Sequence, residues 1–237
     1  MTLILDGKKV RDERSEALAA EVAGLPSVPT LVIIQVGDRE DSNAYIEQKV
    51  RFGETLGVGV EVIKFAPDAP ENEVRATIIA ANIRTEVAGV IIQLPLPEHL
   101  NTFGLIEEIS PHKDVDGLTA TNYKRLMTGV PALIPATARG VRSLLSYYGV
   151  VSLGSQAVVV GRSMLVGTPI AQVLQNDGAT VTVCHRQTRN LEGVTRSADI
   201  LIAAAGEPGL ITASHVSDGQ SVVDVGITCV SGEKHDE

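Results

Sequence analysis

The sequence predicts an α/β protein of two domains, each built around a parallel sheet. Three observations support this prediction. Short runs rich in Val and Ile recur along the chain, as is typical of strands buried on both faces. Segments with apolar residues at helical spacing separate most of these runs. The chain has 237 residues, which exceeds the usual size of a single domain.

The first half of the chain alternates predicted strands with predicted helices. We expect strands at 31–37, 58–65 and 87–96, and helices at Asn43–Leu56, Glu71–Thr85 and Leu100–Ile109. Such alternation favours parallel pairing, with the helices as crossovers. Ligands then bind at the carboxyl ends of the strands.

The second half repeats this order after a break between Asp116 and Ser155 that is rich in turn residues. We expect strands at 156–161, 179–184, 198–206 and 221–227, and helices at Thr137–Tyr148, Pro169–Asn176 and Leu191–Arg196. The break places a domain boundary near residues 120 to 140. We therefore divide the chain into domains 1–120 and 121–237.

Composition excludes several classes of protein. The formal charge is −9 and the pI is near 5.1, and no Lys/Arg cluster supplies the basic face that a nucleic acid needs. Cys184 and Cys229 are the two cysteines and show no CxxC spacing, so neither a disulfide framework nor a cysteine zinc site is expected. A reducing cytoplasm fits this usage. No segment approaches the ~18 apolar residues of a spanning helix, and we expect no signal peptide.

The stretch QAVVVGRSMLVGTPIAQV indicates a strand, a glycine loop and a helix. Gly161 ends the strand and Gly167 follows six positions later, with Thr168 as candidate N-cap and Pro169 at the first helical position. Such a helix start directs unpaired backbone N–H groups at an anion, and a dinucleotide pyrophosphate is the expected guest. The spacing is not G-x-G-x-x-G, so a structural turn is the alternative.

Two arginines favour NADP over NAD as the cofactor. The strand after the loop ends in His185 and Arg186, where NAD sites usually carry an acid, and Arg162 lies in the loop itself. Both side chains suit a 2′-phosphate, although two ordinary surface arginines are the alternative. Gly206 and Gly226 close the next two strands, where a nicotinamide would pass near the backbone or a turn would need glycine.

Four polar residues of the first domain are candidates for a site. Tyr45 and Lys49 share one face of a helix because they are four residues apart, an arrangement that a solvated surface explains equally well. Gln93 interrupts a buried-looking strand, where a polar side chain is costly unless it is paired. Asp114 and Asp116 precede Gly117 in a turn-rich stretch, and turn chemistry explains both; metal binding by the pair is disfavoured because no third ligand is evident.

Seven stretches together carry a family resemblance: SNAYIEQK, VIIQLPLP, PHKDVDGLT, VVVGRSMLVGTP, ATVTVCHRQT, ADILIAAAGEPGLI and SVVDVGI. In this order they resemble the bifunctional methylenetetrahydrofolate dehydrogenase/methenyltetrahydrofolate cyclohydrolase family. The resemblance implies that residues 1–120 bind folate and that residues 121–237 form a Rossmann-type NADP domain. It also implies oxidation of 5,10-methylenetetrahydrofolate with NADP+, then hydrolysis to 10-formyltetrahydrofolate in a cleft shared by the domains.

The resemblance implies a role for each candidate residue. Lys49 matches the family's catalytic lysine, Gln93 its hydrogen-bond partner, Tyr45 the tyrosine that stacks on the pterin and Asp116 the acid that holds it. The cofactor contacts expected in this way are Gly161, Arg162, Ser163, Val166, Gly167, Pro169, Arg186, Gly206 and Ile227. A homodimer joined through the cofactor domain, a cytoplasmic location and a place in one-carbon metabolism that serves purine biosynthesis are implied as well.

The sequence departs from the family pattern in two places. Pro135-Ala136-Thr137-Ala138 stands where the family commonly has P-C-T-P. After VGITCVSGEKHDE the family's further strand, its P-G-G-V-G-P motif and a helix returning to the first domain do not follow. If that segment is lacking, we expect cofactor binding and domain closure to be affected.

Three alternatives to the bifunctional enzyme stay open at this point. A dehydrogenase of the shikimate-dehydrogenase type also pairs a lysine with an acid beside a Rossmann domain, although QLPLP and KDVDG disfavour it. A nucleotide-binding homologue without activity is the second alternative. The third is a dehydrogenase that lacks efficient cyclohydrolase activity.

Overall fold

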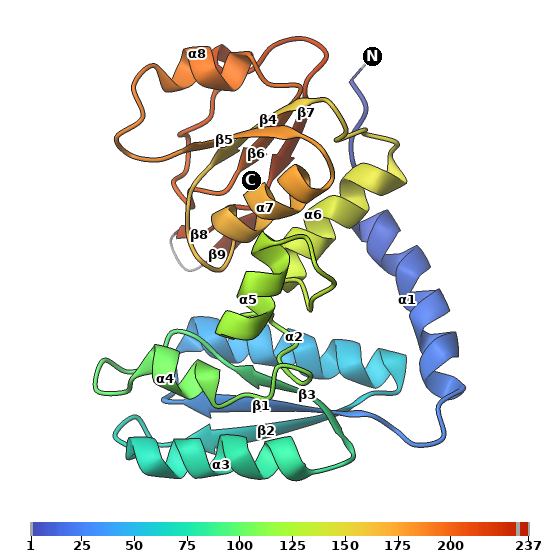
Figure 1. Ribbon diagram of the computed structural model, residues 1–237, viewed down its shortest axis with the longest axis vertical. Helices are drawn as coiled ribbons and strands as arrows, with labels where there is room; N and C mark the ends of the chain where they lie inside the picture. The colour runs from blue at the N-terminus through green and yellow to red at the C-terminus, as the bar shows by residue number, and fades with distance from the viewer. Residues whose placement is uncertain (1, 231–232, 237) are drawn as a thin grey trace. The chain divides into compact units, whose positions relative to one another are not determined.

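A computed structural model describes the backbone of residues 2–230 and 233–236 and the side chains up to residue 226. The chain forms two compact units. One is Arg11–Arg125; the other joins the N-terminal residues through Val10 to the residues from Leu126 onward. Both units are α/β with parallel sheets, so the predicted fold class is confirmed (Figure 1).

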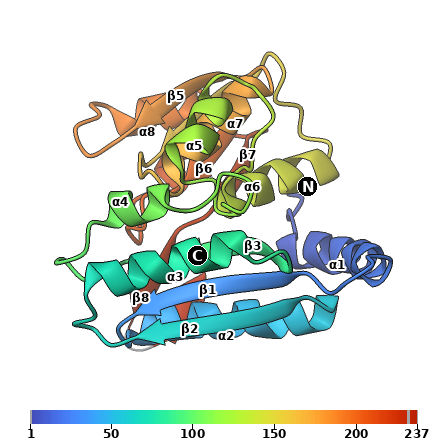
Figure 2. The same cartoon turned by 60° about the horizontal axis from the view of Figure 1, so that its bottom comes forward.

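The Arg11–Arg125 unit contains a three-stranded parallel sheet of order β2-β1-β3. Its strands are β1 (Thr30–Val36), β2 (Gly59–Phe65) and β3 (Val87–Ile92). The crossover helices are α2 (Glu40–Leu56) and α3 (Glu71–Ile83), and they cover opposite faces of the sheet (Figure 2). The short helix α4 (Thr102–Glu107) joins α3 on its face.

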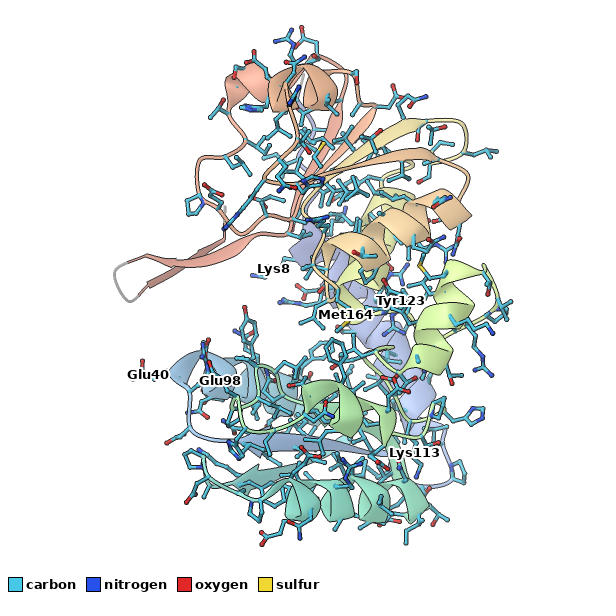
Figure 3. The ribbon with its side chains drawn as sticks, turned by 60° about the vertical axis from the view of Figure 1, so that its left-hand side comes forward. Lys8, Glu40, Glu98, Lys113, Tyr123 and Met164 are labelled. Atoms are coloured by element: carbon cyan, nitrogen blue, oxygen red, sulfur yellow. The ribbon has the colours of Figure 1, made fainter. Side chains whose placement is uncertain are left out.

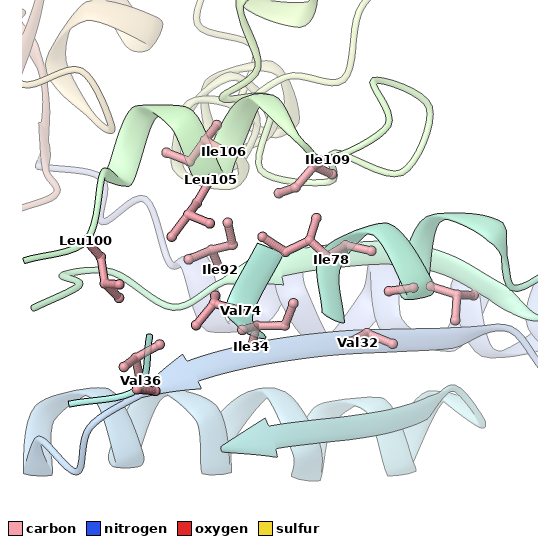
Figure 4. Close-up of a cluster of buried hydrophobic side chains, with 14 residues drawn as sticks. Val32, Ile34, Val36, Val74, Ile78, Ile92, Leu100, Leu105, Ile106 and Ile109 are labelled. Carbon is pink, nitrogen blue, oxygen red and sulfur yellow. The ribbon is translucent and has the colours of Figure 1, made fainter. Parts of the chain in front are cut away.

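Alternation along β1 explains why both faces need a helix. Val32, Ile34 and Val36 point into the cluster that contains Ile78 of α3 (Figure 4). Ile33 points the other way and packs with Ile46 of α2. A strand buried on both faces must be continuously apolar, which is why LVII carries no polar residue.

The second unit contains a four-stranded parallel sheet of order β5-β4-β6-β7. Its strands are β4 (Gln156–Val160), β5 (Thr180–Cys184), β6 (Ile200–Ala203) and β7 (Ser221–Asp224). Helices α6 (Ala136–Tyr147) and α7 (Gly167–Asn176) pack on one face, and α8 (Leu191–Arg196) packs on the other. A single 3-10 turn, η1 (Ala213–His215), precedes β7.

Several elements differ from the sequence-based expectation. The helices α1 (Gly7–Ala23) and α5 (Ala120–Met127) and the antiparallel hairpin of β8 (Ile227–Val230) and β9 (Glu233–Asp236) were not expected. In α1 the only buried residue is Val10, so the helix has almost no apolar periodicity to detect. The strand expected at 87–96 ends at Ile92, ahead of Pro95, which cannot donate to a ladder.

Two neighbouring isoleucines of α3 test the core of the first unit. Ile78 is fully buried and Ile79 is 46% exposed. We expect Ile78→Ala to lower the free energy of unfolding by about 2–5 kcal/mol, because it leaves a cavity against β1. Ile79→Ala should change it by no more than about 0.5 kcal/mol. Urea unfolding followed by circular dichroism measures both, and equal losses would contradict the assigned core.

Candidate functional site

Lys49 and Gln93 meet at the carboxyl edge of the first sheet. The backbone N–H of Gln93 donates to the Ile34 carbonyl at 2.8 Å, which holds the residue beside β1 just beyond the end of β3. The Lys49 ammonium nitrogen lies 2.9 Å from Gln93 Oε1, although 44 positions separate the two residues. Gln93 Nε2 donates to the Leu94 carbonyl at 3.0 Å and so orients the amide. The fold therefore presents its lysine to a fixed neutral acceptor.

Burial and opposite charge act against each other at Lys49 and Asp116. Burial lowers the pKa of Lys49 below its ordinary value, and the Asp116 carboxylate partly opposes that shift. Burial also raises the pKa of Asp116, which the charge of Lys49 lowers and that of Asp114 raises. Since desolvation is the larger cause for both groups, each holds its charge less strongly than it would in water. Groups of this kind concentrate at functional sites.

Tyr45 lies one turn before Lys49 on α2 and is half-buried, so the two side chains share a helix face as the spacing predicted. A hydrogen bond from β1 fixes the first turn of α2. Gln35 on β1 is 3% exposed and its Nε2 donates to Asn43 Oδ1 at 2.7 Å. Asn43 Nδ2 in turn donates to Asp38 Oδ1 at 2.8 Å.

Sequence reasoning did not single out Gln35 or Asn43. The available signal is the polar residue near the end of LVIIQVG, which parallels Gln93 in VIIQLP. In both cases an amide at the end of an apolar run is paired with a side chain of α2, Asn43 for Gln35 and Lys49 for Gln93.

The second unit has a cleft of about 880 Å³ at the carboxyl ends of β4, β5 and β6. This volume lies in the range of small-molecule and cofactor sites. Five of the residues expected to contact a cofactor line it: Gly161, Arg162, Ser163, Arg186 and Gly206. His185 and Glu207 line it too, and Arg162, Arg186 and Glu207 are exposed. Two arginines therefore line one concave surface, as a polyanionic ligand would require.

Two glycines permit the close packing behind this cleft. Gly161 has φ +125°, and a Cβ there would collide with the Ala204 carbonyl at the end of β6. A Cβ on Gly167 would collide with the carbonyl of Gly161. Both glycines therefore bring the loop, a neighbouring strand and the helix start together, and Gly167 is itself buried.

The helix after the loop begins earlier than expected. Helix α7 starts at Gly167, so Thr168 is not its N-cap and Pro169 is not its first residue. The hydroxyl of Ser163 accepts the backbone N–H groups of Val166 at 3.2 Å and Gly167 at 3.3 Å. These N–H groups gain an acceptor from within the loop, which allows the helix to begin two residues before the proline.

The other expected cofactor residues lie away from the lining. Val166 is half-buried and Pro169 is buried in α7. Ile227 begins β8, and its side chain lies outside the described residues. Gly226 lines a small pocket that shares Gly206 and Glu207 with the cleft.

Within the described residues, no group of three or more His, Cys, Asp or Glu side chains could hold a metal ion. In the same part of the chain no helix is long and apolar enough to cross a membrane.

Two α/β units, one with a glycine-loop cleft and the other with a desolvated lysine at a sheet edge, define a two-domain protein with a Rossmann-type cofactor unit. A family model described as "Tetrahydrofolate dehydrogenase/cyclohydrolase, catalytic domain" matches residues 5–116. A second, "Tetrahydrofolate dehydrogenase/cyclohydrolase, NAD(P)-binding domain", matches residues 135–236. The chain belongs to the tetrahydrofolate dehydrogenase/cyclohydrolase family, and the resemblance seen in the sequence is confirmed.

Known proteins match this chain over most of their own length. The bifunctional protein FolD of Amoebophilus asiaticus is 40% identical over 236 residues, which cover 96% of this chain and 79% of the relative. The crystal structure of the bifunctional FolD enzyme from Campylobacter jejuni matches with a TM-score of 0.95 at 37% identity, covering 98% and 84% of the two chains. That of the Trypanosoma brucei dehydrogenase-cyclohydrolase, complexed with NADP and an inhibitor, matches with a TM-score of 0.92 at 32% identity, covering 97% and 80%. The shikimate-dehydrogenase alternative is therefore set aside.

The desolvation of Lys49 predicts a measurable dependence of stability on pH. Between its lowered pKa in the folded chain and its ordinary value of 10.5, the unfolded chain binds more protons at this residue. The free energy of unfolding therefore rises with pH across that window. Lys49→Met removes this contribution, so the difference in stability should shift in favour of the wild type as pH rises toward 10.5.

Urea unfolding at a series of alkaline pH values measures this difference. Lys8→Met, at an exposed lysine, serves as the control and should follow the wild type. Parallel profiles for Lys49→Met and the wild type would contradict the assigned desolvation.

Proposed function

We propose that this protein is a bifunctional one-carbon folate enzyme. It oxidises 5,10-methylenetetrahydrofolate to 5,10-methenyltetrahydrofolate with NADP+ and then hydrolyses this product to 10-formyltetrahydrofolate. The Lys49–Gln93 hydrogen bond of 2.9 Å beside Asp116 is the observation that carries the proposal. Family membership and the names of the relatives support it.

Hydrolysis of the methenyl cation needs a base, which Lys49 supplies. The oxygen of water bonds to the methenyl carbon and gives one proton to the amine. The bond from that carbon to N5 then breaks as the C=O bond forms, and N5 takes a proton. A lysine with a lowered pKa has a larger neutral fraction near neutral pH than an exposed one. Gln93 accepts one N–H of the amine and thereby directs the other N–H and the lone pair of the nitrogen toward the substrate.

Oxidation of the methylene group needs alignment and control of charge more than a strong base. The nitrogen next to the methylene supplies the electrons for a C=N+ bond, and NADP+, when bound, accepts the hydride. A desolvated Lys49 with a neutral amide partner opposes the developing cation less than a fixed ammonium ion would. Gln93 adds no charge while it fixes the lysine.

Asp116 and Tyr45 hold the folate in this proposal. The Asp116 carboxyl is partly buried and accepts N–H groups of the pterin ring. Tyr45 stacks on the pterin from the helix face that it shares with Lys49. An aromatic ring adds apolar contact to this otherwise polar edge.

The cleft of the second unit fits a dinucleotide. Backbone at Gly161 and Gly206 lets a ligand approach closely, and Ser163 shapes the loop. Arg162 and Arg186 bind the 2′-phosphate, which favours NADP over NAD. Val166, Gly167 and Pro169 support the loop from behind, and Ile227 completes the set of cofactor contacts.

Further assignments belong to the same proposal. Residues 1–120 are the folate-binding catalytic domain and residues 121–237 the NADP-binding domain. The protein acts in the cytoplasm as a homodimer joined through the cofactor domain, and its product serves purine biosynthesis. Edge strands β5 and β7 carry half-exposed Val183 and Val222 and offer surface for such a contact.

Lys49→Ala tests the catalytic role of the lysine. We expect hydrolysis of 5,10-methenyltetrahydrofolate to fall by about 100-fold or more, since the general base is lost. Folate binding should persist in part, because Tyr45 and Asp116 remain. The loss of absorbance of the methenyl compound measures the rate, with Lys8→Ala as control. Hydrolysis at the wild-type rate in Lys49→Ala would exclude the assigned role.

Cofactor choice is tested at the two arginines. Arg162→Gln and Arg186→Gln should each raise the KM for NADP+ about 10-fold or more, because each loses a charge-assisted contact to phosphate. The KM for NAD+, which lacks that phosphate, should change little. Arg189→Gln is the matched control, since Arg189 is exposed nearby but does not line the cleft. Equal losses with both cofactors would assign the arginines elsewhere.

A further inference from the structure

Asp114 carries a buried carboxylate that the proposed reaction does not use. It is 1% exposed and belongs to the loop that follows α4. Its Oδ1 accepts the backbone N–H of Leu118 at 3.0 Å, and its Oδ2 accepts that of Thr119 at 2.8 Å. The side chain of Asn122 donates to the same Oδ2 at 2.9 Å. A carboxylate taken so far out of water depends on these N–H groups for stabilisation.

The amide of Asn122 is oriented for this carboxylate at a cost. Its nitrogen donates both to the Pro111 carbonyl at 2.7 Å and to Asp114. Its Oδ1 is buried and has no hydrogen-bond partner among the described residues. An unsatisfied buried oxygen is unfavourable, so the two donated bonds outweigh it. Turning the amide over would remove both donated bonds and place Oδ1 against two acceptors, the Pro111 carbonyl and the Asp114 carboxylate.

The loop held in this way is the one that bears Asp116. Its beginning is fixed to β3, where the Val90 N–H donates to the Lys113 carbonyl at 2.7 Å. The Lys113 side chain, labelled in Figure 3, donates to the Arg84 carbonyl at 2.6 Å. The backbone carbonyl of Asp114 accepts the Gly117 N–H at 3.0 Å, which closes a turn around Asp116.

Asp114 thus accepts three backbone N–H groups from the chain after Asp116: one, from Gly117, through its backbone carbonyl, and two, from Leu118 and Thr119, through its carboxylate. Gly117, the last residue of this turn, has φ +64°, a left-handed conformation that glycine adopts without strain. These hydrogen bonds to Asp114 fix the main chain that directly follows Asp116.

We propose that Asp114 is a positioning residue for the folate site and acts through Asp116. Its buried carboxylate, with Thr119 and Asn122, sets where the Asp116 carboxyl stands beside Lys49. This inference rests on the proposed function, because it assigns Asp116 to folate. It predicts that Asp114 affects folate use and leaves the cofactor cleft of the other unit unchanged.

A double-mutant cycle of Asp114→Asn and Asp116→Asn tests this role. In Asp114→Asn an NH₂ group replaces one of the two oxygens, each of which faces at least one donor, so the loop loses its fixed geometry. We expect the KM for 5,10-methylenetetrahydrofolate to rise about 10-fold, as the loss of one charge-assisted hydrogen bond would produce. On the Asp116→Asn background the same change should raise it less than about 2-fold, because residues that act through one another are not additive.

A merely structural role gives a different result. Independent effects would multiply across the cycle, and loss of folded protein would lower the apparent kcat while leaving the KM for both substrates unchanged. Full multiplication, or an unchanged folate KM in Asp114→Asn, would overturn the inference. Asp68→Asn, at an exposed aspartate of the same unit, is the matched control and should behave as the wild type.

Two further measurements keep the outcomes distinct. If Asp114→Asn does not fold, as judged by circular dichroism, Asn122→Ala removes a single donor and keeps the carboxylate. Asn122→Ala should raise the folate KM by a smaller factor, and this rise should likewise be lost on the Asp116→Asn background. A rise of equal size on both backgrounds would overturn the inference. Turnover of 5,10-methylenetetrahydrofolate by the wild type tests the proposed function separately. If the wild type turns over 5,10-methylenetetrahydrofolate but the effects of the variants on KM are additive, only the role of Asp114 is rejected and the proposed function stands.

Discussion

Burial of parallel strands between two layers of helices is the constraint on which both units depend. The central strands, β1 in one sheet and β4 and β6 in the other, send alternate side chains into two different cores. Such strands admit a polar side chain only near their ends, where it can be paired, so functional side chains gather there. Gln35 and Gln93 are found at that edge in the first unit, and the cofactor cleft occupies it in the second.

The chemistry of the first unit depends on how far Lys49 and Asp116 are removed from water. Burial lowers the pKa of Lys49 and raises that of Asp116, and the attraction between the two charges opposes both shifts only in part. A neutral amide is the partner that keeps this balance, because Gln93 orients the lysine without deciding its charge. A carboxylate in its place would hold the ammonium form and remove the base that hydrolysis needs.

Close backbone packing organises the second unit. The Ala204 carbonyl occupies the space that a side chain at Gly161 would need, and the Gly161 carbonyl occupies the space that a side chain at Gly167 would need. A larger residue at either position would therefore displace β6 or α7. Ser163 then uses its hydroxyl to start the helix, while the arginines remain free to face the cleft. Structural and binding roles of this loop are therefore not alternatives, since the same glycines serve both.

The sequence by itself determined the fold class, the order of most strands and helices, and the residues that carry the family resemblance, because these follow from local periodicity and motif. It also placed Tyr45 and Lys49 on one helix face. The family resemblance implied the pairing of Lys49 with Gln93, but only the tertiary structure gave its geometry across 44 positions. Only the tertiary structure showed that the Asp114 carboxylate is buried and accepts three N–H groups. It also revealed α1, whose polar sequence shows no apolar periodicity, and the early start of α7. Such contacts join segments whose spacing in the chain is unrelated to their distance in space, and burial, which sets the pKa of Lys49, is a property of the assembled fold.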